Sequence, residues 1–243
     1  MIELQWGQVA WVSGTLAIAA SIQGVAGFGF MLIAAAGLIQ LYPAQLVVPG
    51  LVLVYIPLGI AQTFQVRRQV DVPLLRAWML SALFGILPGT LILTAVDSLT
   101  MKRGIGVVMM ILAILLRVRP GEPVASERFA RFGAGLLSGA LGASTSVAGP
   151  PIVLFGIKQR WEVEPFRASL LAYFTVLSAV IVLLQHQFGL VTVETAVWAA
   201  GGLPGIVVGF VVANLMRDKV SDEHFRVLGV ALVFGSGMMA LLF

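Results

Sequence analysis

The chain has 243 residues, of which 59% are hydrophobic and only 11% charged, and its formal net charge is +4. Because soluble domains carry about 25% charged residues, this composition excludes an ordinary soluble protein and indicates a helical protein that crosses a membrane several times. The absence of cysteine excludes disulfides and thiolate chemistry, and two distant histidines cannot supply a metal site of ordinary ligand number. We therefore expect no metal, no cofactor and no nucleic-acid partner, since the basic residues are spread over short loops.

Long apolar stretches separated by short polar loops predict eight membrane segments. In chain order they are Val9–Leu41, Leu46–Phe64, Leu74–Val96, Gly104–Leu116, Phe132–Ile157, Phe166–Leu184, Val193–Met216 and Phe225–Phe243. A polar linker at residues 119–131 follows the fourth segment. It divides the chain into a first transmembrane repeat, residues 1–118, and a second, residues 132–243.

The first segment, Val9–Leu41, is too long for a single span, and Gly24–Gly29 divides it into two arms. Each arm of a dozen or more residues reaches only ~18–20 Å at ~1.5 Å per residue, which is less than a ~30 Å hydrocarbon core. We expect a re-entrant hairpin, in which both arms return to the same face. A long, tilted and kinked helix is the alternative.

The fifth segment contains a similar interruption between Gly139 and Gly156, with four glycines, three consecutive hydroxyl residues and the pair Pro150-Pro151. Glycine and proline weaken a continuous helix, whereas proline is favoured in the first turn of a helix that restarts. The N-terminus of such a half-helix favours anions, because its N–H groups lack partners and its dipole is positive there. We therefore expect a small anion to lie between the two interruptions.

Three motifs recur in the same order in the two halves and predict an internal repeat, as is common in transporters. The matching pairs are Gln23–Gly29 with Ser138–Ser144, Gly85–Gly89 with Gly201–Gly205, and Arg103–Val107 with Arg226–Val230.

The distribution of Lys and Arg over the loops favours re-entrant hairpins over eight simple spans. Simple spans give eight basic residues on one side and seven on the other, whereas two hairpins give thirteen against two, with only Lys102 and Arg103 outside. In the hairpin arrangement both termini lie outside and the linker is cytoplasmic. The expected fold is thus an all-α polytopic membrane protein of two inverted repeats, each with one broken hairpin and three transmembrane helices.

The residues expected to bind the anion lie at the two interruptions and on the sixth segment. The glycine clusters have an alternative role, because glycines in membrane helices also allow close packing of helices. The side chain of Arg167 either extends to the membrane interface or reaches the anion. The sequence has no serine and histidine placed to react together within the membrane, and it has no phosphate-binding loop. None of its motifs therefore indicates an enzyme. The candidate substrate-binding residues are Gln23, Gly27, Phe28, Gly29, Ser144, Thr145, Ser146, Gly149, Arg167 and Tyr173.

Five short motifs have a characteristic order and spacing. They are Gln23-Gly24-Val-Ala-Gly27-Phe28-Gly29-Phe30, Gly139-Ala-Leu-Gly142, Gly149-Pro150-Pro151, Lys158-Gln159-Arg160-Trp161 and Phe166-Arg167-Ala168. Over essentially the whole chain the sequence resembles the sulfite exporter TauE/SafE family, also called toluene sulfonate uptake permeases. Many members carry a glycine-rich run before the proline, where this chain has Ala143–Ala148, which favours hydroxyl-assisted binding here.

The resemblance implies transport of sulfite, sulfonates or related small organic anions across a bacterial inner membrane. We expect an alternating-access carrier that holds the anion between the two interruptions, with an anion channel and a non-transport membrane scaffold as alternatives. The expected partners are the anionic substrate and the lipid bilayer, and a homodimer is one arrangement open to the chain.

Overall fold

The computed structural model describes residues 6–115 and 126–216, and within these two ranges the chain is all-helical, with no strand. The expected eighth segment, Phe225–Phe243, and most of the linker lie outside the described residues. The helices are α1 (Trp6–Ala26), α2 (Phe30–Leu38), α3 (Ala44–Val66), α4 (Val72–Ala95), α5 (Ser98–Leu115), α6 (Glu127–Thr145), α7 (Gly149–Lys158), α8 (Val163–Gln187) and α9 (Val193–Met216), with a 3-10 turn at Arg67–Gln69.

Four of these helices, α3, α4, α8 and α9, are long and apolar enough to cross a membrane. Within the most apolar 18-residue stretch of each helix, 67% of α3 and 61% of α8 is buried inside the protein, compared with 44% of α4 and 39% of α9. The pair α3 and α8 therefore forms the centre of the protein. By contrast, α4 and α9 present large exposed apolar side chains such as Phe84 and Val207 to the surroundings.

Both expected interruptions are present as breaks between separate helices. The chain leaves α1 at Ala26 and starts α2 at Phe30, and Gly27 and Gly29 take positive φ angles of 81° and 106°, which glycine adopts without strain. The indole Nε1 of Trp11, near the start of α1, donates to the carbonyl of Gly37, near the end of α2, over 3.2 Å. α2 therefore runs back along α1.

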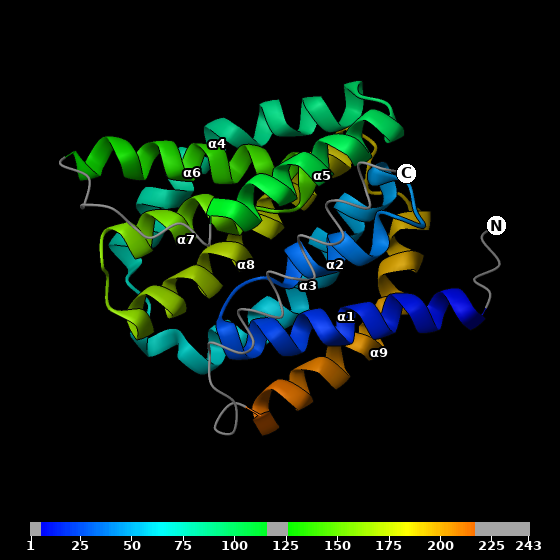
Figure 1. Ribbon diagram of the computed structural model, residues 1–243, viewed down its shortest axis with the longest axis horizontal. Coiled ribbons are helices and arrows are strands. Elements are labelled where there is room, and N and C mark those ends of the chain that lie inside the picture. Colours follow the sequence, from blue (N-terminus) through cyan, green and yellow to red (C-terminus); the bar gives the residue numbers. More distant parts are fainter. Residues whose placement is uncertain (1–5, 116–125, 217–243) are drawn as a thin grey trace.

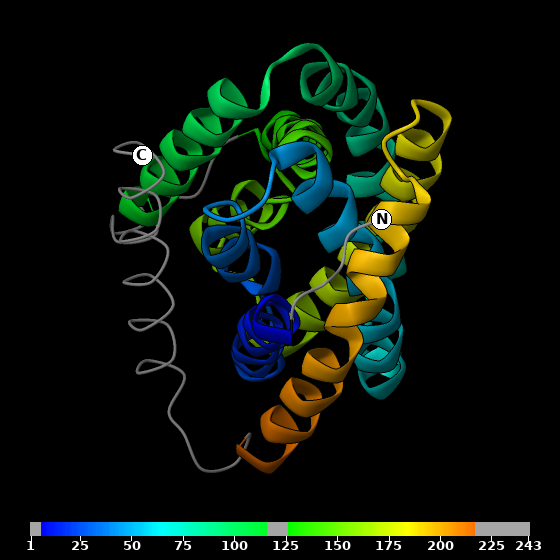
Figure 2. The same cartoon turned by 90° about the vertical axis from the view of Figure 1, so that its right-hand side faces the viewer.

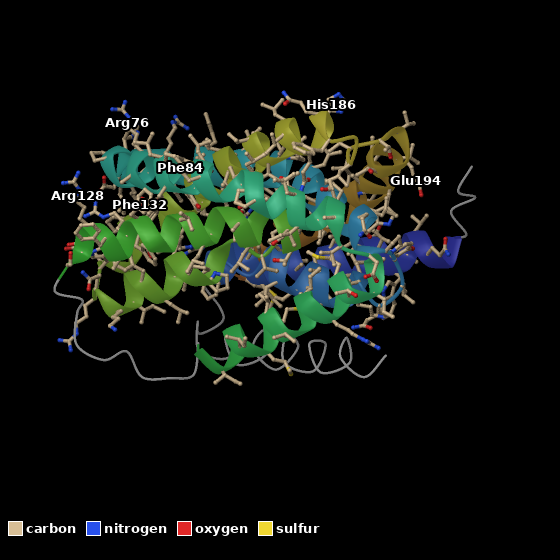
Figure 3. The ribbon with its side chains drawn as sticks, turned by 90° about the horizontal axis from the view of Figure 1, so that it is seen from above. Arg76, Phe84, Arg128, Phe132, His186 and Glu194 are labelled. Atoms are coloured by element: carbon tan, nitrogen blue, oxygen red, sulfur yellow. The ribbon has the colours of Figure 1, made fainter. Side chains whose placement is uncertain are left out.

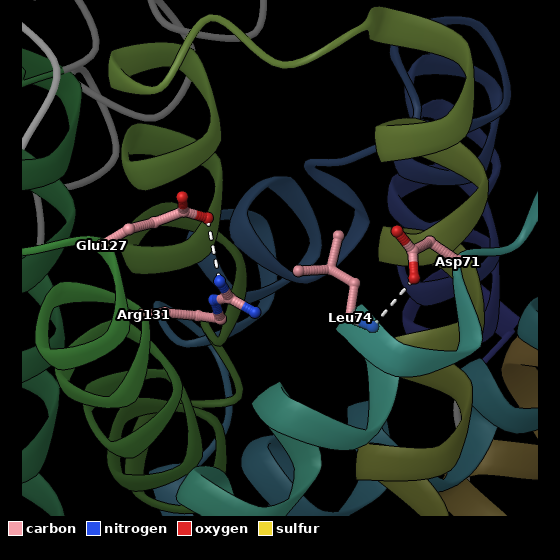
Figure 4. Close-up of polar contacts among 4 residues, drawn as sticks. All are labelled: Asp71, Leu74, Glu127 and Arg131. Atoms are coloured by element: carbon pink, nitrogen blue, oxygen red, sulfur yellow. Dashed lines mark hydrogen bonds and ion pairs between the residues drawn. The ribbon is translucent and has the colours of Figure 1, made fainter.

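The second break separates α6 from α7, and Ser146 ends α6 in a left-handed conformation with φ 64°. α7 begins at Gly149 with proline in its first turn, as the sequence predicts. α6 itself begins at Glu127, five residues before the expected segment, and an ion pair of 2.9 Å between Glu127 and Arg131 adds to the stability of its start (Figure 4).

The helices before the two breaks, α1 and α6, each pack along a long helix from the other half of the chain. Figure 1 shows α1 beside α9 and α6 beside α4. The hydroxyls of Ser13 and Ser21 donate to the carbonyls of Gly201 and Gly209, so α1 and α9 run parallel. Glycines bring the backbones close together: a Cβ atom at Gly85 or Gly139 would overlap a carbonyl oxygen of the facing helix.

The helices end at two polar faces. Asp71 caps α4 by accepting from the N–H of Leu74 over 2.9 Å (Figure 4), and this cap lies beside the starts of α6 and α8. Figure 3 shows Arg76 and Arg128 at this end and His186 and Glu194 at the opposite end. We call the first end the arginine face. Figure 2, viewed along the long axis, shows α2 inside the protein and α9 along its outside.

We predict that Gly139→Ala destabilises the protein by about 1–3 kcal/mol, because the added methyl group meets the backbone of α4 and the two helices must separate. The matched control is Gly133→Ala in the same helix, where no atom lies within 4 Å of the new Cβ. Because alanine favours a helix more than glycine does, the control substitution is expected to stabilise the protein by about 0.5–1 kcal/mol. Thermal unfolding in detergent measures both, and equal melting temperatures for the two variants would contradict the close packing of α4 and α6.

Candidate functional site

The two helix breaks, which lie more than 100 residues apart in the sequence, line one cavity in the middle of the protein. Its volume is about 40 Å³. Since one water needs roughly 10–15 Å³ by this measure, the cavity has room for a few waters or one small ion. Its walls are Gln23, Phe28, Gly29, Met31, Leu32, Val52, Tyr55, Gly142, Ser146, Val147, Ala148, Gly149, Pro150, Phe174, Leu177, Ser178 and Ile181.

Gln23, which is 2% exposed, ties the first break together. Its Oε1 accepts from the backbone N–H of Phe30 over 2.9 Å, while its Nε2 donates to Tyr55 Oη over 2.7 Å and to Gln62 Oε1 over 3.1 Å. Because a backbone N–H can only donate, the bond to Phe30 fixes which end of the Gln23 amide is the oxygen. The side chain therefore both caps α2 and joins α1 to α3.

Ser138 has the corresponding role at the second break. It stands immediately before Gly139, as Gln23 stands before Gly24, and its hydroxyl donates to the carbonyl of Ala148 over 2.6 Å. It also accepts from the hydroxyl of Tyr173 on α8 over 2.9 Å, whereas Gln23 bonds Tyr55 on α3. Each break is thus fastened to a buried tyrosine of the next long helix.

The three consecutive hydroxyl residues of the second break point in different directions. Ser144 and Thr145 donate to the carbonyls of Ala140 and Leu141, four residues back in α6, each over 2.7 Å. Thr145 Oγ1 also accepts from the N–H of Val147 over 3.2 Å. Ser146 is the residue of this triplet that lines the cavity, and its hydroxyl donates to the carbonyl of Thr145 over 2.6 Å. In this structure the hydroxyls of Ser144 and Thr145 are therefore satisfied by carbonyls of their own helix.

The half-helix starts offer a small number of N–H groups to the cavity. Pro150 and Pro151 have no N–H, so Gly149 supplies the donor at the very start of α7. In α2 the N–H of Phe30 is already bonded to Gln23, and Met31 and Leu32, which belong to the same first turn, line the cavity. Much of the remaining wall is apolar, so a bound anion loses water and depends on these few donors.

Arg167 lies outside the central cavity. Its Nη2 donates to the carbonyl of Gly24 near the end of α1 over 2.6 Å, and it lines a second cavity toward the arginine face. The absence of a side chain at Gly27 makes room for it, because a Cβ there would lie 2.6 Å from Arg167 Cγ.

The structure thus divides the ten residues expected to bind the anion into two groups. The central cavity brings together Gln23, Phe28, Gly29, Ser146 and Gly149. Gly27, Ser144, Thr145, Arg167 and Tyr173 lie around it without lining it, and their role in binding stays a prediction. No group of three or more His, Cys, Asp or Glu within residues 6–115 and 126–216 is arranged to hold a metal ion.

Ser178 also lines the cavity, and it is not one of the ten residues that the sequence predicts to bind the anion. A signal for it is present, since Phe174, Leu177, Ser178 and Ile181 follow the spacing of one helix face and all four line the cavity. A serine on an otherwise apolar face of a membrane helix is the feature that points to the site.

We predict that Gln23→Leu destabilises the protein by about 1–3 kcal/mol, because the N–H of Phe30 loses its acceptor in a buried position. Tyr173→Phe removes one hydrogen bond at the other break and costs about 0.5–1.5 kcal/mol. Thermal unfolding in detergent ranks the two variants. A Gln23→Leu protein as stable as the wild type would show that Gln23 does not hold the first break.

Comparison with known proteins gives a match to one family model over nearly the whole chain. The family is described as "Sulfite exporter TauE/SafE", and residues 12–240 are matched. Comparison with curated proteins and with solved structures yields no match.

Proposed function

We propose a transport mechanism for this chain, which belongs to the sulfite exporter TauE/SafE family. The family is one of membrane transporters of sulfite-type anions, and the long apolar helices make the chain a multi-pass membrane protein. In our proposal a small anion of the sulfite type occupies the central cavity and is exposed to the two faces of the membrane in turn.

The observation that carries the proposal is the meeting of both helix breaks at a single cavity inside an apolar core. Non-helical backbone at membrane depth is tolerated where it lines a cavity or is packed in protein. Two half-helix starts and the hydroxyl of Ser178 supply donors that replace part of the hydration shell of an anion, and the hydroxyl of Ser146 joins them when it turns from the carbonyl of Thr145, to which it donates over 2.6 Å, toward the anion. The volume of about 40 Å³ favours a small oxyanion such as sulfite over a bulky sulfonate.

Packing between the halves supports an inverted repeat. If a two-fold axis relates the halves, α1 corresponds to α6 and α4 corresponds to α9, so the contact of α1 with α9 has its counterpart in the contact of α6 with α4. Both contacts are present, and α3 and α8, which would correspond to each other, pack together at the centre. Rocking of the pair α1 and α9 against the pair α4 and α6 would expose a site between them alternately to each side.

We predict that Ser146→Ala and Ser178→Ala each raise the half-saturating sulfite concentration about 10-fold, because a hydrogen bond to a charged group is worth about 1.5–3 kcal/mol. Sulfite uptake and counterflow in reconstituted vesicles measure this. Ser21→Ala is the matched control, since Ser21 is a half-buried serine that bonds backbone carbonyls away from the cavity.

Saturable counterflow supports a carrier, whereas unitary conductance indicates a channel. Unchanged kinetics in both cavity variants would refute the central site, and the same assay on a Ser144→Ala/Thr145→Ala protein tests the ligand role that the sequence predicts for these two residues.

The arginine face is proposed to be cytoplasmic. Among the described residues it carries the basic residues of the loops before α4 and after α7 and of the first turns of α4, α6 and α8, while Lys102 and Arg103 lie near the start of α5 at the opposite end. An excess of Lys and Arg marks cytoplasmic loops. This orientation places the start of α1 outside a bacterial inner membrane.

The cysteine-free chain allows this orientation to be tested without background labelling. We predict that an impermeant maleimide labels a Glu194→Cys protein in intact cells and labels an Arg76→Cys protein only after permeabilisation. Both side chains are exposed and lie at opposite ends in Figure 3. The reverse pattern would invert the proposed topology.

A further inference from the structure

We propose that the second cavity, between Gln23 and the arginine face, is a separate anion subsite formed by the amide of Gln62 and the guanidinium of Arg167. The inference rests on the proposed transport function and deepens it, because the subsite would hold the anion before it passes to the central cavity. The sequence alone suggests Arg167 as a counter-charge for an anion in the central site. The structure places Arg167 in the second cavity, so its charge serves a different position from the central site.

The two cavities meet at one hydrogen-bonded chain of side chains. Tyr55 lines the central cavity, Gln62 lines the second, and Gln23 lines both. Gln23 donates to Tyr55 and to Gln62, so the chain Tyr55–Gln23–Gln62 runs from one cavity to the other. Movement of the Gln23 side chain would join the cavities.

Gln62 provides the observation that points to a ligand. It is 4% exposed, and its Nε2 has no hydrogen-bond partner among the described residues. The orientation of its amide is fixed by its neighbour: the N–H of Phe30 defines the oxygen of Gln23, the Gln23 Nε2 then donates to Gln62, and the accepting atom of Gln62 must be its oxygen. A buried N–H without an acceptor costs about 1–3 kcal/mol, which a bound anion would remove.

Arg167 gives this cavity a positive charge. Its bond of 2.6 Å to the carbonyl of Gly24 holds the guanidinium at the wall of this cavity. Guanidinium groups and oxyanions form charge-assisted hydrogen bonds, which are stronger than those between neutral groups. The cavity measures about 20 Å³ and is bordered by the exposed side chains of Gln65 and Asn214, so an anion is held at its mouth and not enclosed.

The experiment measures sulfite transport separately from each face, in right-side-out and inside-out membrane vesicles. Gln62→Glu keeps the oxygen that accepts from Gln23 but replaces the N–H donor by a negative charge, and Arg167→Gln removes the positive charge. Each is expected to raise the half-saturating sulfite concentration at the arginine face about 10-fold and to change it less than 2-fold at the other face. Arg76→Gln, an exposed arginine of the same face outside both cavities, is the control.

A binding measurement separates failure of the subsite from failure of the transport proposal. Radiolabelled sulfite is titrated into the purified full-length protein, with two ions per chain expected for the wild type and one for the Gln62→Glu/Arg167→Gln protein. Equal stoichiometry in the two proteins, or equal kinetic changes at both faces, would overturn the subsite. Absence of wild-type flux together with Gln62- and Arg167-dependent binding would refute transport and leave the subsite intact.

Discussion

A helix that stops inside an apolar layer leaves backbone N–H and C=O groups without water, and the rest of this structure depends on how those groups are satisfied. At the first break Gln23 accepts from the N–H of Phe30, and Arg167 donates to the carbonyl of Gly24. At the second break Thr145 accepts from the N–H of Val147, and Ser138 donates to the carbonyl of Ala148. Polar side chains thus replace the missing helical bonds, and the cavity between the breaks exists because they do.

Close backbone contact joins the described helices into tightly packed pairs, α1 with α9 and α4 with α6. Gly205 meets α1 and Gly139 meets α4 with no space for a Cβ atom, so each hairpin arm is fixed to a long helix of the other half of the chain. The contact between α3 and α8 is different, since the hydroxyls of Thr63 and Thr175 lie 3.1 Å apart there and side chains fill the interface. Sliding at this central contact is less costly than separation at the glycine contacts, which suits a carrier that rocks about its middle.

The sequence predicts the breaks well and the directions of side chains poorly. Glycines at 27 and 29 and the prolines after Gly149 act through local backbone preferences, so a reader of the sequence can locate both interruptions. The hydroxyls of Ser144 and Thr145 are different, because each has a carbonyl four residues back as a competing partner. The choice depends on which face of α6 packs against α4, and no pattern within residues 139–156 contains that information.

Gln23 has two roles: it holds the first helix break together, and its side chain forms the barrier between the central and the second cavity. Its three hydrogen bonds go to a backbone N–H, a tyrosine hydroxyl and the carbonyl oxygen of Gln62, and the last two acceptors are neutral. A charged oxygen is a stronger acceptor than either, so an anion in one of the cavities competes for the Gln23 N–H groups. In the proposed mechanism the arriving anion replaces Tyr55 or Gln62 as the acceptor of a Gln23 N–H. The bond to Phe30 is spared in this exchange, which lets the barrier open while the first helix break remains capped.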